Sequence, residues 1–71
     1  MTYNESKSDE FGRVITSLRL GYMELSQVKF IMDYYLELEE YGRVAGAMEA
    51  YNEYKKELDD EYRHREIKED S

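Results

Sequence analysis

The sequence offers very few side chains that can perform catalysis. It contains a single histidine, His64, and no cysteine, so nucleophilic catalysis by a thiol is excluded. A serine nucleophile needs a base that a third group orients, and His64 stands between Arg63 and Arg65 near the end of the sequence. The four glycines are isolated from one another, so there is no glycine-rich phosphate-binding loop. These features predict a protein that is not an enzyme.

One pair of residues has the spacing of a metal site. Glu61 and His64 form a Glu-x-x-His pair, which supplies ligands in carboxylate-bridged di-iron bundles when both side chains point into the core. Glu37 or Glu40 would complete such a set. At about 100° per residue, however, Glu61 and His64 lie roughly 80° and 140° from the centre of the apolar stripe of their helix. We therefore expect His64 to be a surface residue, with no metal and no cofactor bound.

A row of glutamates is the most prominent charged feature. Its members recur at every fourth position, which places them along one side of a helix: Glu49, Glu53, Glu57 and Glu61. Neighbouring like charges at this spacing destabilise a helix by roughly 0.2–0.5 kcal/mol per pair. This acidic row is either an ordinary solvated face or a surface that receives basic residues of a protein partner. All four glutamates are therefore candidate partner-binding residues.

The aromatic residues form a second candidate surface. The chain has eight tyrosines and no tryptophan. Tyrosine combines a large apolar ring with a hydroxyl that tolerates solvent, and aromatic residues are frequent anchors at protein interfaces. Core and boundary packing is the alternative role, and we assign it to Tyr22, Tyr35 and Tyr51. We expect Phe30, Tyr34 and Tyr41 to lie together on the flank of one helix, in a subunit or partner interface.

Small residues at every fourth position indicate a close contact between helices. Gly42, Gly46 and Ala50 share one face of a helix. A glycine inside a helix costs about 1 kcal/mol relative to alanine, so the missing side chain at Gly46 is expected to be needed. We favour a tight crossing with another helix of the same chain over a ligand site, because small side chains let two backbones approach.

The composition narrows the class of protein further. The 71 residues allow one domain, and 17 acidic against 10 basic residues give a net charge of −7. Proteins that bind nucleic acid are usually basic, so direct nucleic-acid binding is not expected. No apolar run approaches the roughly 20 residues of a membrane span. The lack of cysteine fits a reducing compartment, and we expect a cytoplasmic protein that does not enter the membrane.

Three amphipathic segments are expected to position these residues. The apolar periodicity predicts helices over 8–21, 26–41 and about 43–66. A serine stands at the start of each of the first two segments, where it is a suitable N-cap. Gly42 lies between the second and third segments, as a linker or as the C-terminal cap of the second. The first helix is expected to end at the glycine that closes its range.

The middle helix has more apolar surface than one neighbour covers. Its apolar residues spread over about 240° of the helical wheel: Val28, Phe30, Ile31, Met32, Tyr34, Tyr35, Leu36 and Leu38. Small scaffolds also need extra burial to be stable. We therefore predict an all-α fold, a helical hairpin or three-helix bundle completed by homodimerisation. Residues 1–7 are expected to be disordered, 8–66 to form the single domain and 67–71 to be a frayed acidic tail.

The first segment also fits a strand, because apolar and other residues alternate over 14–22. We favour a helix, since a lone strand is unstable unless it pairs with another chain. The stretch 16–20, Thr-Ser-Leu-Arg-Leu, followed by two helices, resembles the ribbon-helix-helix repressors. The resemblance implies a dimeric DNA-binding transcriptional regulator or antitoxin, in which Ser17 and Arg19 read the major groove.

The favoured functional prediction is a small, acidic, non-enzymatic helical protein that binds and regulates a protein partner, as an inhibitor or an adaptor. The partner is expected to have a basic surface, because the chain is acidic. The predicted contact residues are the four glutamates of the acidic row together with Phe30, Tyr34 and Tyr41. The ribbon-helix-helix regulator is the alternative.

Overall fold

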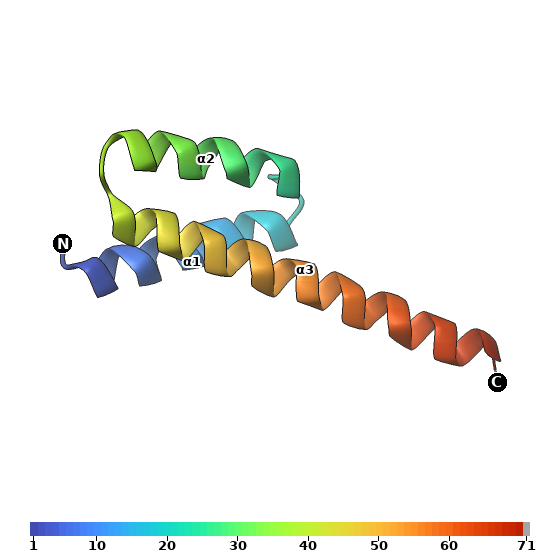
Figure 1. The fold of residues 1–71 in the computed structure, drawn as a ribbon. Helices are drawn as coiled ribbons and strands as arrows, with labels where there is room; N and C mark the ends of the chain where they lie inside the picture. Colours follow the sequence, from blue (N-terminus) through green and yellow to red (C-terminus); the bar gives the residue numbers. More distant parts are fainter. Residues whose placement is uncertain (71) are drawn as a thin grey trace.

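The computed structural model describes the backbone of residues 1–70 and the side chains of residues 1–62. It contains three helices, α1 (Tyr3–Arg19), α2 (Leu25–Glu37) and α3 (Tyr41–Asp70). No strand occurs among the described residues, so this part of the chain is all-α, as predicted. Figure 1 shows α1 and α3 side by side and running in the same direction, while α2 returns antiparallel to both.

Helix α1 begins earlier than the sequence pattern predicted. Thr2 is its N-cap, and the backbone N–H of Glu5 donates a hydrogen bond of 3.2 Å to the Thr2 hydroxyl. The predicted start at Ser8 is therefore wrong by five residues. The stretch 1–7, expected to be disordered, holds the cap and the first turn of the helix because a threonine satisfies the free backbone donors.

Helix α2 begins with a glutamate cap instead of the predicted serine. Glu24 is the N-cap, and its backbone N–H donates to the side-chain oxygen of Gln27 at 2.8 Å. The Glu24 side chain in turn accepts from the backbone of Gln27, which makes a reciprocal capping box. Ser26 consequently lies inside the first turn and is not the cap.

Helix α1 ends at a glycine, as the sequence predicts. Gly21 has a positive φ of 79°, a conformation that glycine adopts without the steric penalty of a Cβ atom. The N–H groups of Gly21 and Tyr22 donate to the carbonyl oxygens of Leu18 and Ser17 at 3.2 and 2.9 Å. These two bonds form a Schellman motif, which satisfies carbonyl groups at the end of the helix.

Helix α2 ends in the same way, but with a glutamate in the left-handed position. Glu39 has a φ of 58°, and the N–H groups of Glu39 and Glu40 donate to carbonyls of the last turn at 3.0 and 2.9 Å. The helix ends at Glu37, so the predicted end at Tyr41 is wrong. Gly42 is neither linker nor cap, since it lies buried in the first turn of α3.

The stripe of small residues forms the crossing of α1 and α3. A Cβ atom on Gly46 would lie 2.3 Å from the carbonyl oxygen of Lys7 and 2.9 Å from the backbone nitrogen of Phe11. A Cβ on Gly42 would lie 2.7 Å from a carbonyl oxygen in the first turn of α1. Ala50 continues the stripe and is fully buried. The predicted tight crossing within the chain is confirmed.

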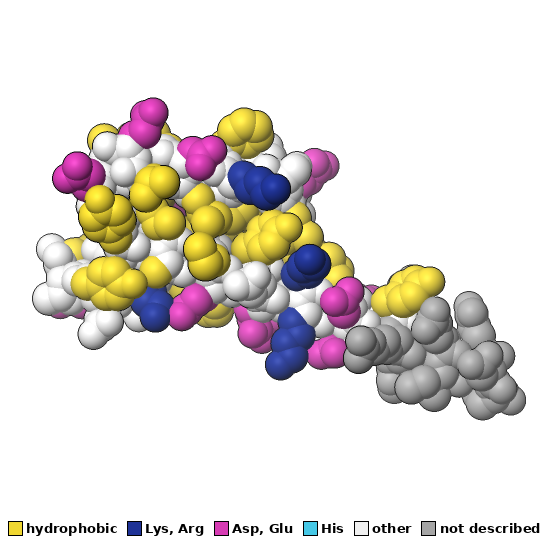
Figure 2. Space-filling view, viewed as in Figure 1, with side chains coloured by type: hydrophobic (Ala, Val, Ile, Leu, Met, Phe, Trp, Pro, Cys, Tyr) yellow, Lys and Arg dark blue, Asp and Glu magenta, His cyan; other side chains and the backbone are white. Residues whose placement is uncertain are grey.

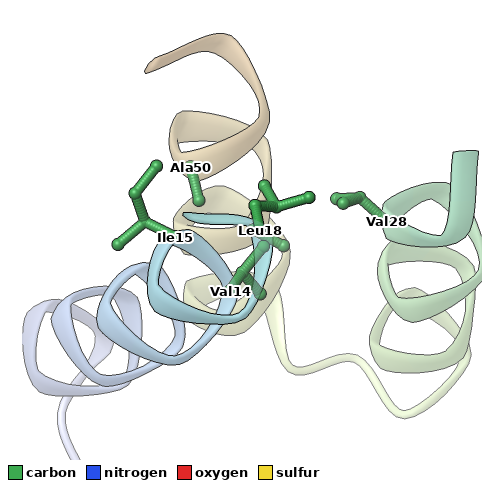
Figure 3. Close-up of a cluster of buried hydrophobic side chains, with 6 residues drawn as sticks. Val14, Ile15, Leu18, Val28 and Ala50 are labelled. Carbon is green, nitrogen blue, oxygen red and sulfur yellow. The ribbon is translucent and has the colours of Figure 1, made fainter. Parts of the chain in front are cut away.

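The core is small and receives side chains from all three helices. Its buried apolar members are Val14, Ile15 and Leu18 of α1, Val28 of α2, and Ala47 and Ala50 of α3. Figure 3 shows Val28 pointing toward Leu18 across the space between α2 and α1. Because the core is so small, much apolar surface of α2 stays outside it.

Helix α3 continues well past the ends of the other two helices (Figure 1). The molecule is therefore elongated, with extents of 50 × 21 × 16 Å. Within the part of the chain that the structure describes, no helix combines the length and the apolar character needed to cross a membrane.

Candidate partner-binding surface

A groove lies between α1 and α2. Both helices pack on α3, but they hardly touch each other. The space between them is about 380 Å3 and is lined by Glu10, Arg13, Val14, Ser17, Met23, Phe30, Ile31, Tyr34 and Tyr35. One wall is therefore mainly polar and belongs to α1, whereas the other is aromatic and belongs to α2.

Two aromatic side chains form a ridge along the α2 wall of this groove. Phe30 is 75% exposed and Tyr34 is 60% exposed, although both line the groove. They stand four residues apart and so share one face of α2. Tyr34 also packs edge-on against Tyr35, with ring centroids 5.3 Å apart. We call Phe30 and Tyr34 the aromatic ridge.

Tyr41 does not belong to the aromatic ridge. It is the first residue of α3, it is 57% exposed and it does not line the groove. The prediction that Tyr41 shares a helix flank with Phe30 and Tyr34 is therefore wrong, because α2 ends four residues earlier at Glu37.

More apolar surface is exposed where α2 and α3 meet. Figure 2 shows hydrophobic side chains over α2 and the first half of α3, with acidic side chains along the outer edge of α2. The exposed residues in this region include Leu36, Leu38, Tyr41 and Met48, each about half exposed. A depression of about 250 Å3 on this side is smaller than the groove between α1 and α2.

Carboxylates without ion-pair partners gather near the aromatic ridge. Four exposed acids make no ion pair with any described residue: Asp33, Glu37, Glu39 and Glu40. Asp33 and Glu37 follow Phe30 and Tyr34 by three residues, so each carboxylate neighbours a ridge ring. The last turn of α2 has no basic residue, and carboxylates there oppose the helix dipole. This acidic end is therefore electrostatically unfavourable in the isolated chain.

The acidic row of α3 is partly occupied by cations of α1. Lys7 Nζ lies 2.9 Å from Oε1 of Glu49, and this contact raises the pKa of Lys7. Arg19 donates from Nε and Nη2 to both carboxylate oxygens of Glu57, with a distance of 3.1 Å from Nε to Oε1. The hydrogen bond from Arg19 lowers the pKa of Glu57. Glu49 and Glu57 of the row thus hold α1 against α3.

A partly buried ion pair network joins the three helices, and sequence reasoning missed it. Arg43 Nη1 of α3 donates to Asp9 Oδ2 and Glu10 Oε1 of α1, each at 2.9 Å. Glu10 is only 4% exposed. The Arg43 guanidinium also lies 5.7 Å from the ring centroid of Tyr35 on α2. The only indication of this network in the sequence is an acidic residue, Glu10, on the apolar face of α1. Its partner could not be predicted, because the pairing depends on the register of α1 against α3.

This network leaves the groove without a polar group that needs a ligand. Glu10 and Tyr35 line the groove, but the Glu10 carboxylate is already engaged by Arg43. Burial, followed by the charge of Glu10, raises the pKa of Tyr35, so its hydroxyl stays protonated at neutral pH. No buried side-chain nitrogen or oxygen among the described residues lacks a hydrogen-bond partner. Apolar contact is therefore the main interaction that the groove offers.

Two further sites that the sequence suggests are a metal site and a DNA-reading ribbon. The described residues contain no group of three or more side chains that could hold a metal ion. His64 of the Glu-x-x-His pair lies outside the described side chains. Residues 16–19 form the end of α1 and Leu20 is its C-cap, so this stretch is not the strand that the ribbon-helix-helix resemblance implies. Ser17 instead lines the groove, and Arg19 pairs with Glu57.

Comparison with known proteins gives no match: no family model, no curated protein and no solved structure corresponds to this chain. The groove, the aromatic ridge and the carboxylates beside them are therefore interpreted from their own geometry and chemistry.

Proposed function

We propose that this chain is a non-enzymatic protein-binding module that regulates its partner as an inhibitor or an adaptor. The partner contributes a surface that is both apolar and basic, and it binds at the aromatic ridge and the groove beside it. The observation that carries the proposal is the exposure of Phe30 and Tyr34, 75% and 60%, at the edge of a preformed groove.

The exposed rings contribute little to folding. Full burial of a phenylalanine side chain stabilises a protein by roughly 1.5–3 kcal/mol, and most of that gain is unused at Phe30. In an interface the same ring becomes buried, and aromatic residues dominate binding energy at such sites. The ridge rings therefore contribute more to the free energy of binding in a complex than to the folding stability of the free chain.

The charges next to the ridge favour a basic partner. Asp33 and Glu37 border the ridge rings, and a cation of a partner would relieve their opposition to the α2 dipole. The net charge of −7 also attracts a basic protein over longer distances and raises its association rate. The acidic row adds to this field, although Glu49 and Glu57 are locally paired.

Homodimerisation, which the wide apolar belt of α2 predicts, is a competing way to cover the ridge. Two copies each carry a net charge of −7, and two facing ridges would bring Asp33 and Glu37 of both copies together. Like charges in contact oppose association. A basic partner protein is therefore favoured over a second copy at this surface.

The proposal is tested by affinity capture from cells that naturally express the chain, with a matched pair of variants. The double variant Phe30→Ala, Tyr34→Ala removes the ridge. Tyr22→Ala removes an aromatic ring that does not line the groove. The prediction that Tyr22 packs in the core is wrong, because its ring is 81% exposed in the turn after α1. We expect the wild type and Tyr22→Ala to retain the same proteins, the double variant to lose them, and added salt to release them. Equal recovery with the double variant would contradict the proposal.

A further inference from the structure

The three helices occupy three of the four corners of a four-helix bundle. In such a bundle each helix packs on two neighbours and lies diagonal to the third. Helix α3 packs on both α1 and α2, whereas α1 and α2 hardly touch, so these two hold diagonal corners. The groove is lined by α1, α2 and the loop between them, with no residue of α3. It therefore lies at the empty corner opposite α3.

The groove suits a helix better than an extended peptide. An extended peptide gains affinity from backbone hydrogen bonds to a sheet edge, and none exists among the described residues. The backbones of α1 and α2 are bonded internally, so they offer few partners along the groove. A helix satisfies its own backbone and needs only side-chain contacts. The apolar side chains of Ile31 and Phe30 provide these contacts, since Val14 lines the groove but is only 1% exposed.

The charges on the two rims differ, and they define the occupant further. On α2, Asp33 and Glu37 follow the two ridge residues by three positions and do not themselves line the groove, so these carboxylates would meet basic residues at the edge of an occupant. Arg13 lines the α1 side of the groove, and its side chain is 68% exposed. Its ion pair is a long one, with 4.0 Å between Nη1 of Arg13 and Oδ2 of Asp9. An occupant is thus expected to be basic on the side facing α2 and polar or acidic on the side facing Arg13.

We propose that the groove receives one amphipathic helix of the partner protein, which completes a four-helix bundle. Its apolar residues, spaced at i, i+3, i+4 and i+7, insert between α1 and α2, and its lysines or arginines lie beside Asp33 and Glu37. The inference rests on the proposed function and adds the kind of element that is bound.

The projecting part of α3 in a second copy is a poorer occupant. It exposes Leu58 and Tyr62, which have the correct spacing for a helical anchor pair. The residues between them, 59–61, are acidic, whereas Lys55 and Lys56 precede them and Arg63 follows, so the segment carries both signs of charge. It therefore matches Asp33 and Glu37 less well than a basic helix does, and we assign the corner to a basic helix from another protein.

Three synthetic peptides of equal length test the inference by isothermal titration calorimetry with the full chain. The first has leucines at helical spacing, lysines on the flank that faces α2 and glutamines elsewhere. The second has the same composition rearranged so that leucines and polar residues alternate with a period of two, as in a strand. The third keeps the leucine positions of the first but carries glutamate in place of lysine. We expect the first to bind and to gain helicity by circular dichroism, the second to bind at least about tenfold more weakly, and the third not to bind.

Matched variants of the chain locate the binding site. Phe30→Ala should weaken the first peptide about tenfold or more, as expected for an aromatic anchor, whereas Tyr22→Ala should leave its affinity unchanged. Glu37→Lys should weaken it as well. Asp60→Lys makes the same change in net charge on the projecting part of α3, away from the groove, and should have a much smaller effect.

Each contrary result overturns the inference. Equal binding of the first two peptides removes the preference for a helix, and no binding of the first at millimolar concentration removes the helix site altogether. If Glu37→Lys and Asp60→Lys weaken the first peptide equally, its binding depends only on the net charge of the chain and not on the groove. A dimer of the free chain that Phe30→Ala dissociates, measured by analytical ultracentrifugation, assigns the corner to a second copy. If captured partners still require the ridge while the peptides fail, the proposed function stands and only the helix inference falls.

Discussion

Replacement of Gly46 by alanine tests how closely α1 and α3 approach. The new Cβ atom would lie 2.3 Å from the carbonyl oxygen of Lys7, although real Cβ atoms almost never come closer than 3.0 Å to a neighbour. The helices must therefore separate locally by about 0.7 Å at this contact. The opposing atoms belong to the backbone of α1, so no side chain can rotate away to relieve the clash.

The expected cost follows from two opposing effects. Overpacking of a tight contact costs about 1–3 kcal/mol and sometimes more, and a rigid backbone contact belongs at the upper end of that range. Alanine has a higher helix propensity than glycine and returns about 1 kcal/mol. We expect Gly46→Ala to lower the free energy of unfolding by about 2 kcal/mol. A domain of this size is stable by about 4–11 kcal/mol, so the loss is measurable.

Gly12→Ala is the matched control for this prediction. Gly12 lies inside α1, and a Cβ atom there would meet nothing within 4 Å. The same substitution should therefore raise the free energy of unfolding by about 0.5–1 kcal/mol through helix propensity alone. Urea denaturation followed by circular dichroism measures both variants. If Gly46→Ala is as stable as Gly12→Ala, the close crossing of α1 and α3 is refuted.

Three further predictions concern the core, the end of α2 and the contact between α1 and α3. Phe30→Ala should change the free energy of unfolding by no more than about 0.5 kcal/mol because the ring is exposed, whereas Leu18→Ala in the core should cost about 2–5 kcal/mol; equal losses in urea denaturation would make Phe30 a core residue and contradict the proposed function. Glu39→Gly should stabilise the chain by up to about 1 kcal/mol, measured as thermal midpoint and urea midpoint, because glycine accepts the positive φ of 58° without strain; a loss of stability would contradict the left-handed turn. The Arg19–Glu57 contact should make stability depend on pH: the pKa of Glu57 is lowered in the folded chain, so its contribution is complete above the ordinary value of 4.5 and is lost as the pH falls through the lower, folded value. The stability difference between the wild type and Glu57→Gln should therefore shrink in urea titrations as the pH falls below the ordinary value of 4.5, and a constant difference would exclude the contact.

Much of the fold follows from local rules that the sequence displays. The spacing of apolar residues predicted three helices, and Gly21 marked the end of α1 because glycine accepts a positive φ. The stripe of Gly42, Gly46 and Ala50 predicted the tight crossing, because a helix retains costly glycines where a neighbour fills their space. These features depend on residues that are close in the sequence.

The predicted start and end of α2 were wrong because residue types other than the usual ones cap and end this helix. Glu24 caps α2 through a reciprocal pair with Gln27, although serine and threonine are the more usual caps. Glu39 ends α2 in a conformation that usually indicates glycine, so no glycine marks this turn in the sequence, and the prediction assigned Tyr41 to the wrong helix.

The candidate site was only partly predictable, because it depends on which helices meet. The exposure of Phe30 and Tyr34 follows from an apolar belt wider than one neighbour can cover. The pairing of Glu49 and Glu57 with cations of α1 depends on the register of two parallel helices that are far apart in the sequence. The acidic row was therefore identified as a surface, while its contacts within the chain were not.

A basic helix that docks at the corner between α1 and α2 must change the surroundings of both helices. Amide chemical-shift mapping by NMR, with the full chain titrated with the basic helical peptide, measures this change residue by residue. We expect shifts on both walls of the groove, around Arg13 and Ser17 on α1 and around Phe30 and Tyr34 on α2. Shifts confined to the acidic row of α3, or no shifts at either wall, would contradict docking at this corner.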